Sequence, residues 1–170
     1  MRPGSPDDVP AAVAIDDAAF TIYRDVGIAV DFGVDHPLVL AEEAAWRHCA
    51  ETGGLFFATA AADHPVGFVA IGAIDGAAHL EQVAVLPAHM RRGIGRLLMD
   101  KAFAVAGDHG HAAIVLTTYD HVPWNRPYYA RLGFEVLAET DWGPGIAATV
   151  ALQRAHLPMP ARRIAMRKIL

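Results

Sequence analysis

The segment 79–96, HLEQVAVLPAHMRRGIGR, constrains the fold more than any other part of the chain. Its first half is rich in apolar residues and predicts a strand over 79–86, which Pro87 ends because proline cannot donate to a strand ladder. Two glycines and three arginines then lead into a helix with an apolar face, predicted over 92–107. The first turn of a helix has free N–H groups and a positive dipole end, and glycine lets an anion approach the backbone. The segment therefore predicts a ligand that carries phosphate.

The arginines support the same prediction. Arg91, Arg92 and Arg96 surround the expected helix start. Cations are unfavourable at a helix N-terminus, so three of them there favour an anion site over a simply solvated helix end.

Two other phosphate-binding designs fail on specific residues. A P-loop requires lysine and a hydroxyl residue after its last glycine, whereas Arg96 and Leu97 follow Gly95. A dinucleotide fingerprint needs a small residue three positions after its second glycine, and Leu98 stands there. Its acidic ribose ligand, expected about twenty residues further on, is replaced by Val115.

Hydrophobic periodicity and turn signals give the remaining elements. The predicted helices are 6–20, 38–52, 92–107, 128–132 and 145–157, and the predicted strands are 55–61, 66–74, 79–86, 113–116, 134–138 and 163–169. The first three strands form an antiparallel meander, and the crossover from 79–86 to 113–116 predicts a parallel pair. The stretch 21–37 is a loop or a broken helix. The result is one domain with a mixed sheet and helices on both faces.

Composition narrows the class of protein. The 170 residues are 54% apolar, with 14 basic and 19 acidic side chains, so a broad nucleic-acid surface is not expected. The single cysteine, Cys49, excludes an intrachain disulfide. No apolar run approaches the roughly 18 residues that span a bilayer, and the first residues lack a signal-peptide core. We therefore expect a cytoplasmic domain without a membrane partner.

Several segments in the right order resemble the GNAT superfamily of N-acetyltransferases. RRGIGR at 91–96, after the strand VAVLP at 83–87, and NRPYYARLGF at 125–134 resemble its two acyl-CoA-binding halves. The resemblance is strongest over 66–138, and RRIAMR at 162–167 also resembles the final strand of many bacterial members.

The resemblance implies a fold and a cofactor site. The fold would be a single α/β domain, residues 1–170, with a mostly antiparallel twisted sheet whose one parallel strand pair splays apart to form the coenzyme A cleft. Acetyl-CoA would be the co-substrate. The residues implied in its binding are Val83, Ala84 and Val85 at a strand bulge, the loop residues Arg91, Arg92, Gly93, Ile94, Gly95 and Arg96, and Asn125. Met90 stands where the family usually has glutamine or arginine, which matters little because the phosphate contacts there are largely backbone groups.

The resemblance also suggests two catalytic residues. Tyr129 matches the family tyrosine that protonates the leaving thiolate, although it is also explained as a core aromatic. Glu81 is the leading candidate for the base that takes the amine proton. It precedes Val83 by two residues, so strand alternation predicts that Glu81 and Val83 share a face. A carboxylate paired within the sheet explains Glu81 equally well. His79 shares that face and is a second candidate.

The implied reaction is acetyl transfer from acetyl-CoA to a primary amine of a small molecule or peptide, by direct attack. A regulatory coenzyme A-binding domain without activity, another acyl-CoA donor and an alcohol acceptor stay open, as does a homodimer. The stretch 21–37 is the expected substrate loop, in which Asp25, Asp31 and Asp35 are candidates for binding a cationic amine. Asp120 and His121 follow a strand end and are weaker candidates. The nine histidines show no metal-ligand spacing, so no metal is expected.

Overall fold

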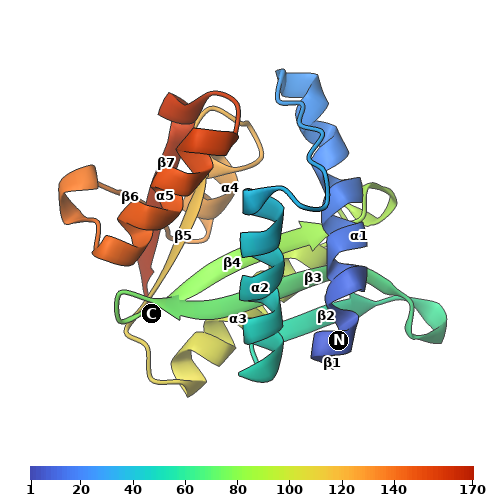
Figure 1. Cartoon of the computed structure of the whole chain (residues 1–170). Coiled ribbons are helices and arrows are strands. Elements are labelled where there is room, and N and C mark those ends of the chain that lie inside the picture. Colours follow the sequence, from blue (N-terminus) through green and yellow to red (C-terminus); the bar gives the residue numbers. More distant parts are fainter.

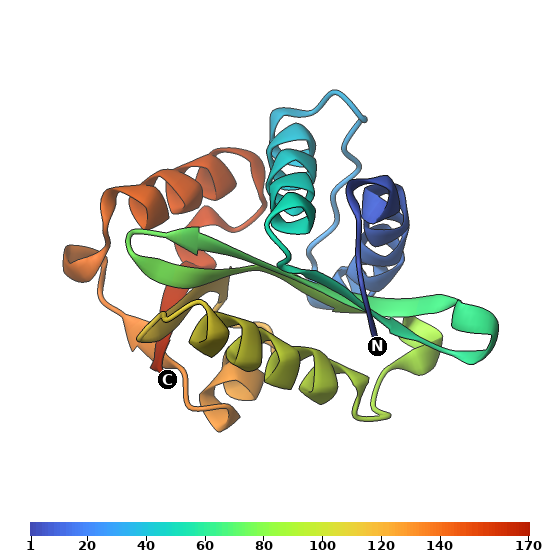
Figure 2. The ribbon, with the colours of Figure 1, turned by 90° about the horizontal axis from the view of Figure 1, so that it is seen from below.

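A computed structural model describes all residues, 1–170, as one seven-stranded sheet with helices on both faces (Figures 1 and 2). The strands are β1 (Arg2–Pro3), β2 (Leu55–Thr59), β3 (Pro65–Ile74), β4 (Ala77–Val85), β5 (Ala113–Tyr119), β6 (Glu135–Leu137) and β7 (Arg163–Ile169). The α-helices are α1 (Val9–Phe20), α2 (Pro37–Glu51), α3 (Ile94–Asp108), α4 (Arg126–Arg131) and α5 (Pro144–His156). Short 3₁₀ helices connect them, the longest being Thr21–Val26.

The sheet order is β1-β2-β3-β4-β5-β7-β6, and β4 with β5 is its parallel pair. All the other neighbours are antiparallel. The predicted meander of β2, β3 and β4 and the predicted crossover through α3 are therefore confirmed. The predicted fold class, a mostly antiparallel α/β sheet with one parallel pair, is confirmed as well.

The parallel pair separates after three residues on each strand. Residues 78–80 of β4 pair with residues 114–116 of β5. Beyond that point β4 continues against β3 as far as Val85, while β5 continues against β7 as far as Tyr119. The two strands thus form the arms of a V that opens toward their C-terminal ends.

A bulge lies where the V begins. Ala70 of β3 faces Gln82, whereas the next residue, Ile71, faces Leu80, which leaves Glu81 as the extra residue of β4. The sequence prediction of a bulge at Val83–Val85 is therefore wrong, because the bulge lies earlier in the strand, at Glu81.

The side chains confirm the shift in alternation. Val83 packs with the α3-side core, whereas Gln82 contacts α1 and Glu81 contacts His79 on the α2 side. The expectation that Glu81 and Val83 share a face is therefore wrong, because the bulge turns Glu81 and Gln82 to the same side.

Helices cover both faces of the sheet (Figure 2), and apolar side chains fill the space between the sheet and the helices on each face. On one face, Leu98 and Met99 of α3 pack against Leu80 and Ile114. On the opposite face, α1 and α2 cover the meander, and the Trp46 ring packs edge-to-face against Phe68. The helix α5 lies on that second face and covers β5 and β7 through Ile146 and Val150.

The observed elements differ from the predictions mainly at their ends. The helix α3 begins at Ile94 rather than Arg92, because Arg91 (φ 59°) and Gly93 (φ 84°) are left-handed and cannot be part of a right-handed helix. The strand β5 runs to Tyr119, three residues beyond its predicted end. No helix is both long enough and apolar enough to cross a bilayer.

The turn between β3 and β4 also anchors α5. The Asp75 carboxylate accepts hydrogen bonds from the backbone N–H groups of Gly145 and Ile146, each at 2.9 Å. A residue of the hairpin turn thus caps a helix about seventy positions later in the chain and holds it over the sheet.

We expect Asp75→Ala to lower the free energy of unfolding by about 1–2 kcal/mol, because it leaves two N–H groups of α5 without their acceptor. Urea denaturation followed by circular dichroism measures this loss. Asp25→Ala, which removes an exposed carboxylate without an ion-pair partner, is the matched control. Equal stability of the two variants would contradict the capping role.

Candidate active site

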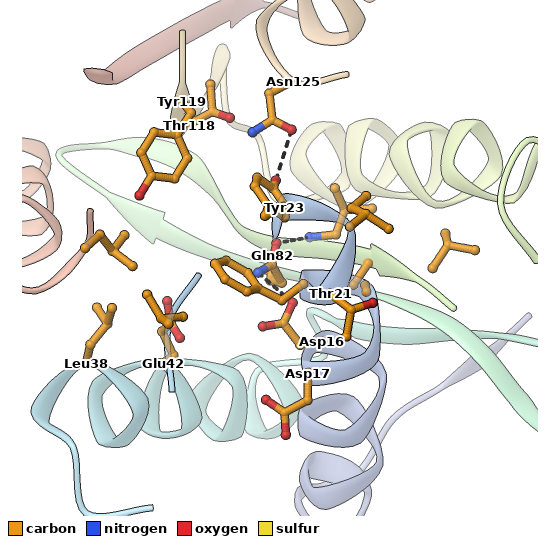
Figure 3. A pocket seen from close by; sticks show the side chains of 18 of the residues that line it. Asp16, Asp17, Thr21, Tyr23, Leu38, Glu42, Gln82, Thr118, Tyr119 and Asn125 are labelled. Carbon is orange, nitrogen blue, oxygen red and sulfur yellow. Dashed lines mark hydrogen bonds between the residues drawn. The ribbon is translucent and has the colours of Figure 1, made fainter. Parts of the chain in front are cut away.

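A cavity of about 700 Å³ lies where β4 and β5 separate (Figure 3). Its walls come from α1, the segment 21–34, α2, the open ends of β4 and β5, the start of α3, α4 and the start of β7. The splayed strands thus give access from both faces of the sheet, with α3 on one side and α1, α2 and α5 on the other.

The start of α3 forms one end of the cavity. Gly93 precedes the helix, and its carbonyl accepts from the N–H of Leu97, so the N–H groups of residues 94–96 have no helical partner. Arg91 and Gly95 line the cavity, whereas Arg92 and Gly93 are exposed outside its lining.

The third arginine of this segment is engaged elsewhere. Arg96 is exposed and pairs with Asp100 one turn along the helix, at 2.8 Å. Its charge is thus shared with a neighbouring carboxylate, unlike the charges of the other two arginines.

The open edge of β4 forms the middle of the cavity. Val83, Ala84 and Val85, the strand residues that the resemblance implies in coenzyme A binding, all line it. The N–H of Val83 donates to the side-chain oxygen of Gln82 at 2.9 Å, and the Gln82 amide donates to Asp16 of α1, also at 2.9 Å (Figure 3). A backbone donor that lost its strand partner is therefore satisfied by a side chain, which a ligand can displace.

Glu81 and His79 form a pair beside the bulge. The His79 Nδ1 lies 2.8 Å from the Glu81 carboxylate, and its Nε2 is enclosed without a partner. Gly72 of β3 makes room for this carboxylate, since a Cβ there would lie 2.8 Å from the Glu81 Oε1. The structure thus brings together the two residues that the sequence offered as candidate bases.

Tyr129 of α4 lines the cavity and packs edge-on against Phe134. Burial raises the pKa of its hydroxyl well above that of a free phenol, so the group keeps its proton at neutral pH. Asn125 is buried, and its side-chain oxygen accepts from the Tyr23 hydroxyl at 3.0 Å. It occupies the position before α4, but its side chain does not cap that helix.

Two acidic side chains line the cavity from the helices above it. Burial raises the pKa of Asp16 to about 8, assisted by the nearby charges of Glu42 and Asp17. Burial likewise raises the pKa of Glu42 to about 7, with Glu81 adding to the rise and Arg163 opposing it. The part of the cavity beside α1 and α2 therefore holds two carboxyl groups whose ionisation becomes easier when a positive charge enters.

The sequence did not identify either acid, although both have a signal. Asp16 interrupts the apolar stripe of α1 between Ala12 and Phe20, and Glu42 interrupts that of α2 between Leu38 and Trp46. An acidic residue at a position where helical spacing demands an apolar one is costly to bury, which points to a role.

The loop aspartates lie differently from the expectation. Asp31 lines the cavity, but Asp25 and Asp35 are exposed and do not. Asp120 pairs with Arg162 at 2.7 Å and, together with His121, lies outside the cavity lining. The segment 21–34 also contributes Tyr23 and Phe32 to the wall.

The single cysteine, Cys49, does not line the cavity. Burial raises the pKa of the Cys49 thiol to about 12, so it is neutral under ordinary conditions. No three histidine, cysteine, aspartate or glutamate side chains gather in a geometry that holds a metal ion.

The comparison with protein families agrees with this geometry. A family profile described as "Acetyltransferase (GNAT) family" matches residues 23–134, well over half of the chain. The chain therefore belongs to the GNAT acetyltransferase family and is an N-acetyltransferase of the acyltransferase class, for which membership implies acetyl-CoA as co-substrate.

Solved structures share the fold. PaiA N-acetyltransferase from Thermoplasma acidophilum, in complex with coenzyme A, superposes with a TM-score of 0.67 at 16% identity, over 99% of this chain and 97% of that one. The ribosomal-protein-S18-alanine N-acetyltransferase of Escherichia coli gives 0.66 at 17% identity, over 99% and 91%. N-acetylglutamate synthase from Neisseria gonorrhoeae, complexed with coenzyme A and N-acetyl-glutamate, gives 0.67 at 13% identity. The match covers 99% of this chain but only 34% of that protein. At these identities the likeness establishes the fold alone.

The raised pKa of Asp16 predicts how stability depends on pH. The folded protein holds this proton more tightly than an unfolded chain, in which the aspartate pKa is about 4. The resulting stability is complete below that value and is lost as the pH rises through about 8. We therefore expect the free energy of unfolding of Asp16→Asn to fall less between pH 5 and pH 9 than that of the native chain.

Urea denaturation at these two pH values measures the difference. Asp35→Asn, an exposed loop substitution, is the control and should follow the native chain. An Asp16→Asn variant whose stability changes with pH as much as that of the native chain would refute the raised pKa.

Proposed function

We propose that the protein transfers the acetyl group of acetyl-CoA to a primary amine by direct attack, in the cavity between β4 and β5. The observation that carries this proposal is the V-shaped opening itself. It places the free N-terminus of α3, the unpaired edge of β4, the Tyr129 hydroxyl and the Glu81 carboxylate around one cavity.

Coenzyme A enters from the α3 side in this proposal. Its pyrophosphate accepts hydrogen bonds from the free N–H groups of residues 94–96, and Arg91 and Arg92 add charge. Arg96 contributes less because Asp100 already neutralises part of its charge. The pantetheine arm follows residues 83–85, and Asn125 donates through its amide nitrogen because its oxygen is taken by Tyr23.

The thioester carbonyl binds at the bulge. Its oxygen gains negative charge as the amine attacks, and the Val83 N–H stabilises that charge after the oxygen replaces the Gln82 side chain. The exchange conserves the number of hydrogen bonds to Val83, so acetyl-CoA binding does not leave a buried donor unsatisfied.

The reaction then balances as follows. The neutral amine nitrogen forms a bond to the carbonyl carbon, and the bond from that carbon to sulfur breaks. That neutral amine forms beforehand, when Glu81, held by His79, takes a proton from the ammonium form of the acceptor, directly or through water, and releases it to solvent. After the attack the nitrogen loses a second proton to solvent. Tyr129 gives its proton to the departing thiolate and recovers one from solvent. The products are an N-acetyl amide and free coenzyme A.

We expect Tyr129→Phe to lower kcat by about 10²- to 10³-fold, because the thiolate then leaves without a proton donor. The affinity for acetyl-CoA, measured by calorimetry, should stay within a few-fold of the native value. Tyr128→Phe removes the neighbouring hydroxyl and serves as the matched control. Full turnover by Tyr129→Phe would exclude the acid role.

We expect Glu81→Gln to reduce kcat/KM most strongly near neutral pH. The deficit should shrink as the pH approaches the amine pKa of about 10, because the acceptor then loses its proton without a base. Rates of coenzyme A release between pH 6.5 and pH 9.5 measure this trend, with Glu51→Gln on the exposed end of α2 as control. A deficit that is the same at every pH would assign Glu81 to substrate positioning instead.

A further inference from the structure

Arg163 is a buried positive charge without a negative partner. It begins β7, opposite Tyr119, and only 8% of its surface is exposed. No carboxylate lies within the 4.0 Å that defines an ion pair. Buried charges in folded proteins are almost always paired, so an isolated guanidinium in a cavity wall needs an explanation.

Its neighbours orient the guanidinium without neutralising it. Nε and Nη2 donate to the Gln153 side-chain oxygen at 3.2 and 2.7 Å, and Nη2 also donates to the Thr117 hydroxyl at 3.2 Å. The guanidinium lies over the Tyr119 ring, 4.7 Å from its centre. Gln153 in turn donates to Thr117, so this arrangement is rigid.

One part of the guanidinium stays free. Nη1 makes no hydrogen bond within the protein and is not among the enclosed polar atoms, and Arg163 lines the cavity. The free donor therefore opens into the cavity, on the side covered by α5 and α2 rather than by α3.

A carboxyl group without an ion-pair partner lines the same side. Glu42 of α2 is close enough to Arg163 to affect its electrostatics, yet the two form no ion pair. Glu81 also lines this region (Figure 3 shows Glu42 across the cavity from Tyr119). This side thus presents the Arg163 guanidinium and the carboxyl groups of Glu42 and Glu81. Neither carboxyl group forms an ion pair with Arg163, and Glu81 pairs with His79 instead.

We propose that the acceptor amine also carries a carboxylate and that Arg163 binds this carboxylate, so that the acceptor is a free amino acid or a similar amino-carboxylate. The amine then lies toward Glu81 and Glu42, where its attack on the thioester is proposed to occur. This inference rests on the proposed acetyl transfer and adds the class of acceptor.

The first test uses the native protein and matched acceptors. Each amino acid of a panel is compared with its α-amide and its decarboxylated amine, and coenzyme A release is followed with acetyl-CoA. We expect kcat/KM for the amino acids to exceed that of the amides by about 10- to 100-fold, the effect of one charge-assisted hydrogen-bonded contact. Equal or better turnover of polyamines, peptides or the decarboxylated amines would overturn the inference.

The second test removes the charge. Arg163→Gln should raise KM for the amino acids about 10- to 100-fold while changing KM for the amides and the affinity for acetyl-CoA little. Arg167→Gln, an exposed arginine on the same strand, is the matched control. Arg163→Lys keeps the charge and should retain part of the preference. An Arg163→Gln variant that kept the full preference would contradict the assignment.

A binding measurement distinguishes failure of the proposed acetyl transfer from failure of the Arg163 inference. Calorimetry with the coenzyme A-bound native protein compares N-acetyl amino acids with their amides, and it needs neither turnover nor a folded variant. If the carboxylates bind preferentially but no amine is acetylated, the transferase proposal fails and the Arg163 site stands. If amines are acetylated but neither turnover nor binding favours carboxylates, the Arg163 inference alone fails.

Discussion

The separation of β4 from β5 is the constraint on which the site depends. Three pairs of residues hold the parallel strands together, and the bulge at Glu81 directs the rest of β4 away. Each unpaired N–H and C=O at such an edge needs another partner, because a buried backbone group without one is costly. The Gln82 side-chain oxygen satisfies the Val83 N–H. The fold therefore has an incomplete strand edge, which the proposed thioester and pantetheine arm would complete.

The same opening explains the unusual electrostatics of the cavity. Asp16 of α1, Glu42 of α2 and Arg163 of β7 line one space, and neither acid forms an ion pair with the arginine. Burial raises the pKa of the two acids and lowers that of the arginine, so the ionised form of each group is disfavoured. A ligand with complementary charges would relieve all three, and this favours a charged acceptor over an apolar one.

Much of the fold could be predicted from local signals. The meander, the crossover and a helix that starts within RRGIGR all follow from periodicity, prolines and glycines within the segment 55–116. The position of the bulge could not be predicted, because an extra residue leaves no signal in the sequence of a strand rich in apolar residues. Regular strand alternation therefore assigned Glu81 to the wrong face. Strand alternation places Arg163 and Arg167 on the same face of β7. Only Arg163 is buried, because it lies beside the end of α5. Strand alternation alone does not distinguish the two arginines.

The two halves of the proposed site differ in how they are built. The coenzyme A half uses mainly backbone groups of one continuous segment, residues 83–96, so a short motif is enough to predict it. The acceptor half uses side chains from α1, α2, α5, β5 and β7, which the fold brings together from most of the chain. Single substitutions there can change the acceptor without disturbing the strand and loop that bind the cofactor. A family motif therefore predicts the donor of the acetyl group, while the acceptor has to be inferred from the assembled cavity, and Arg163 is its most distinctive group.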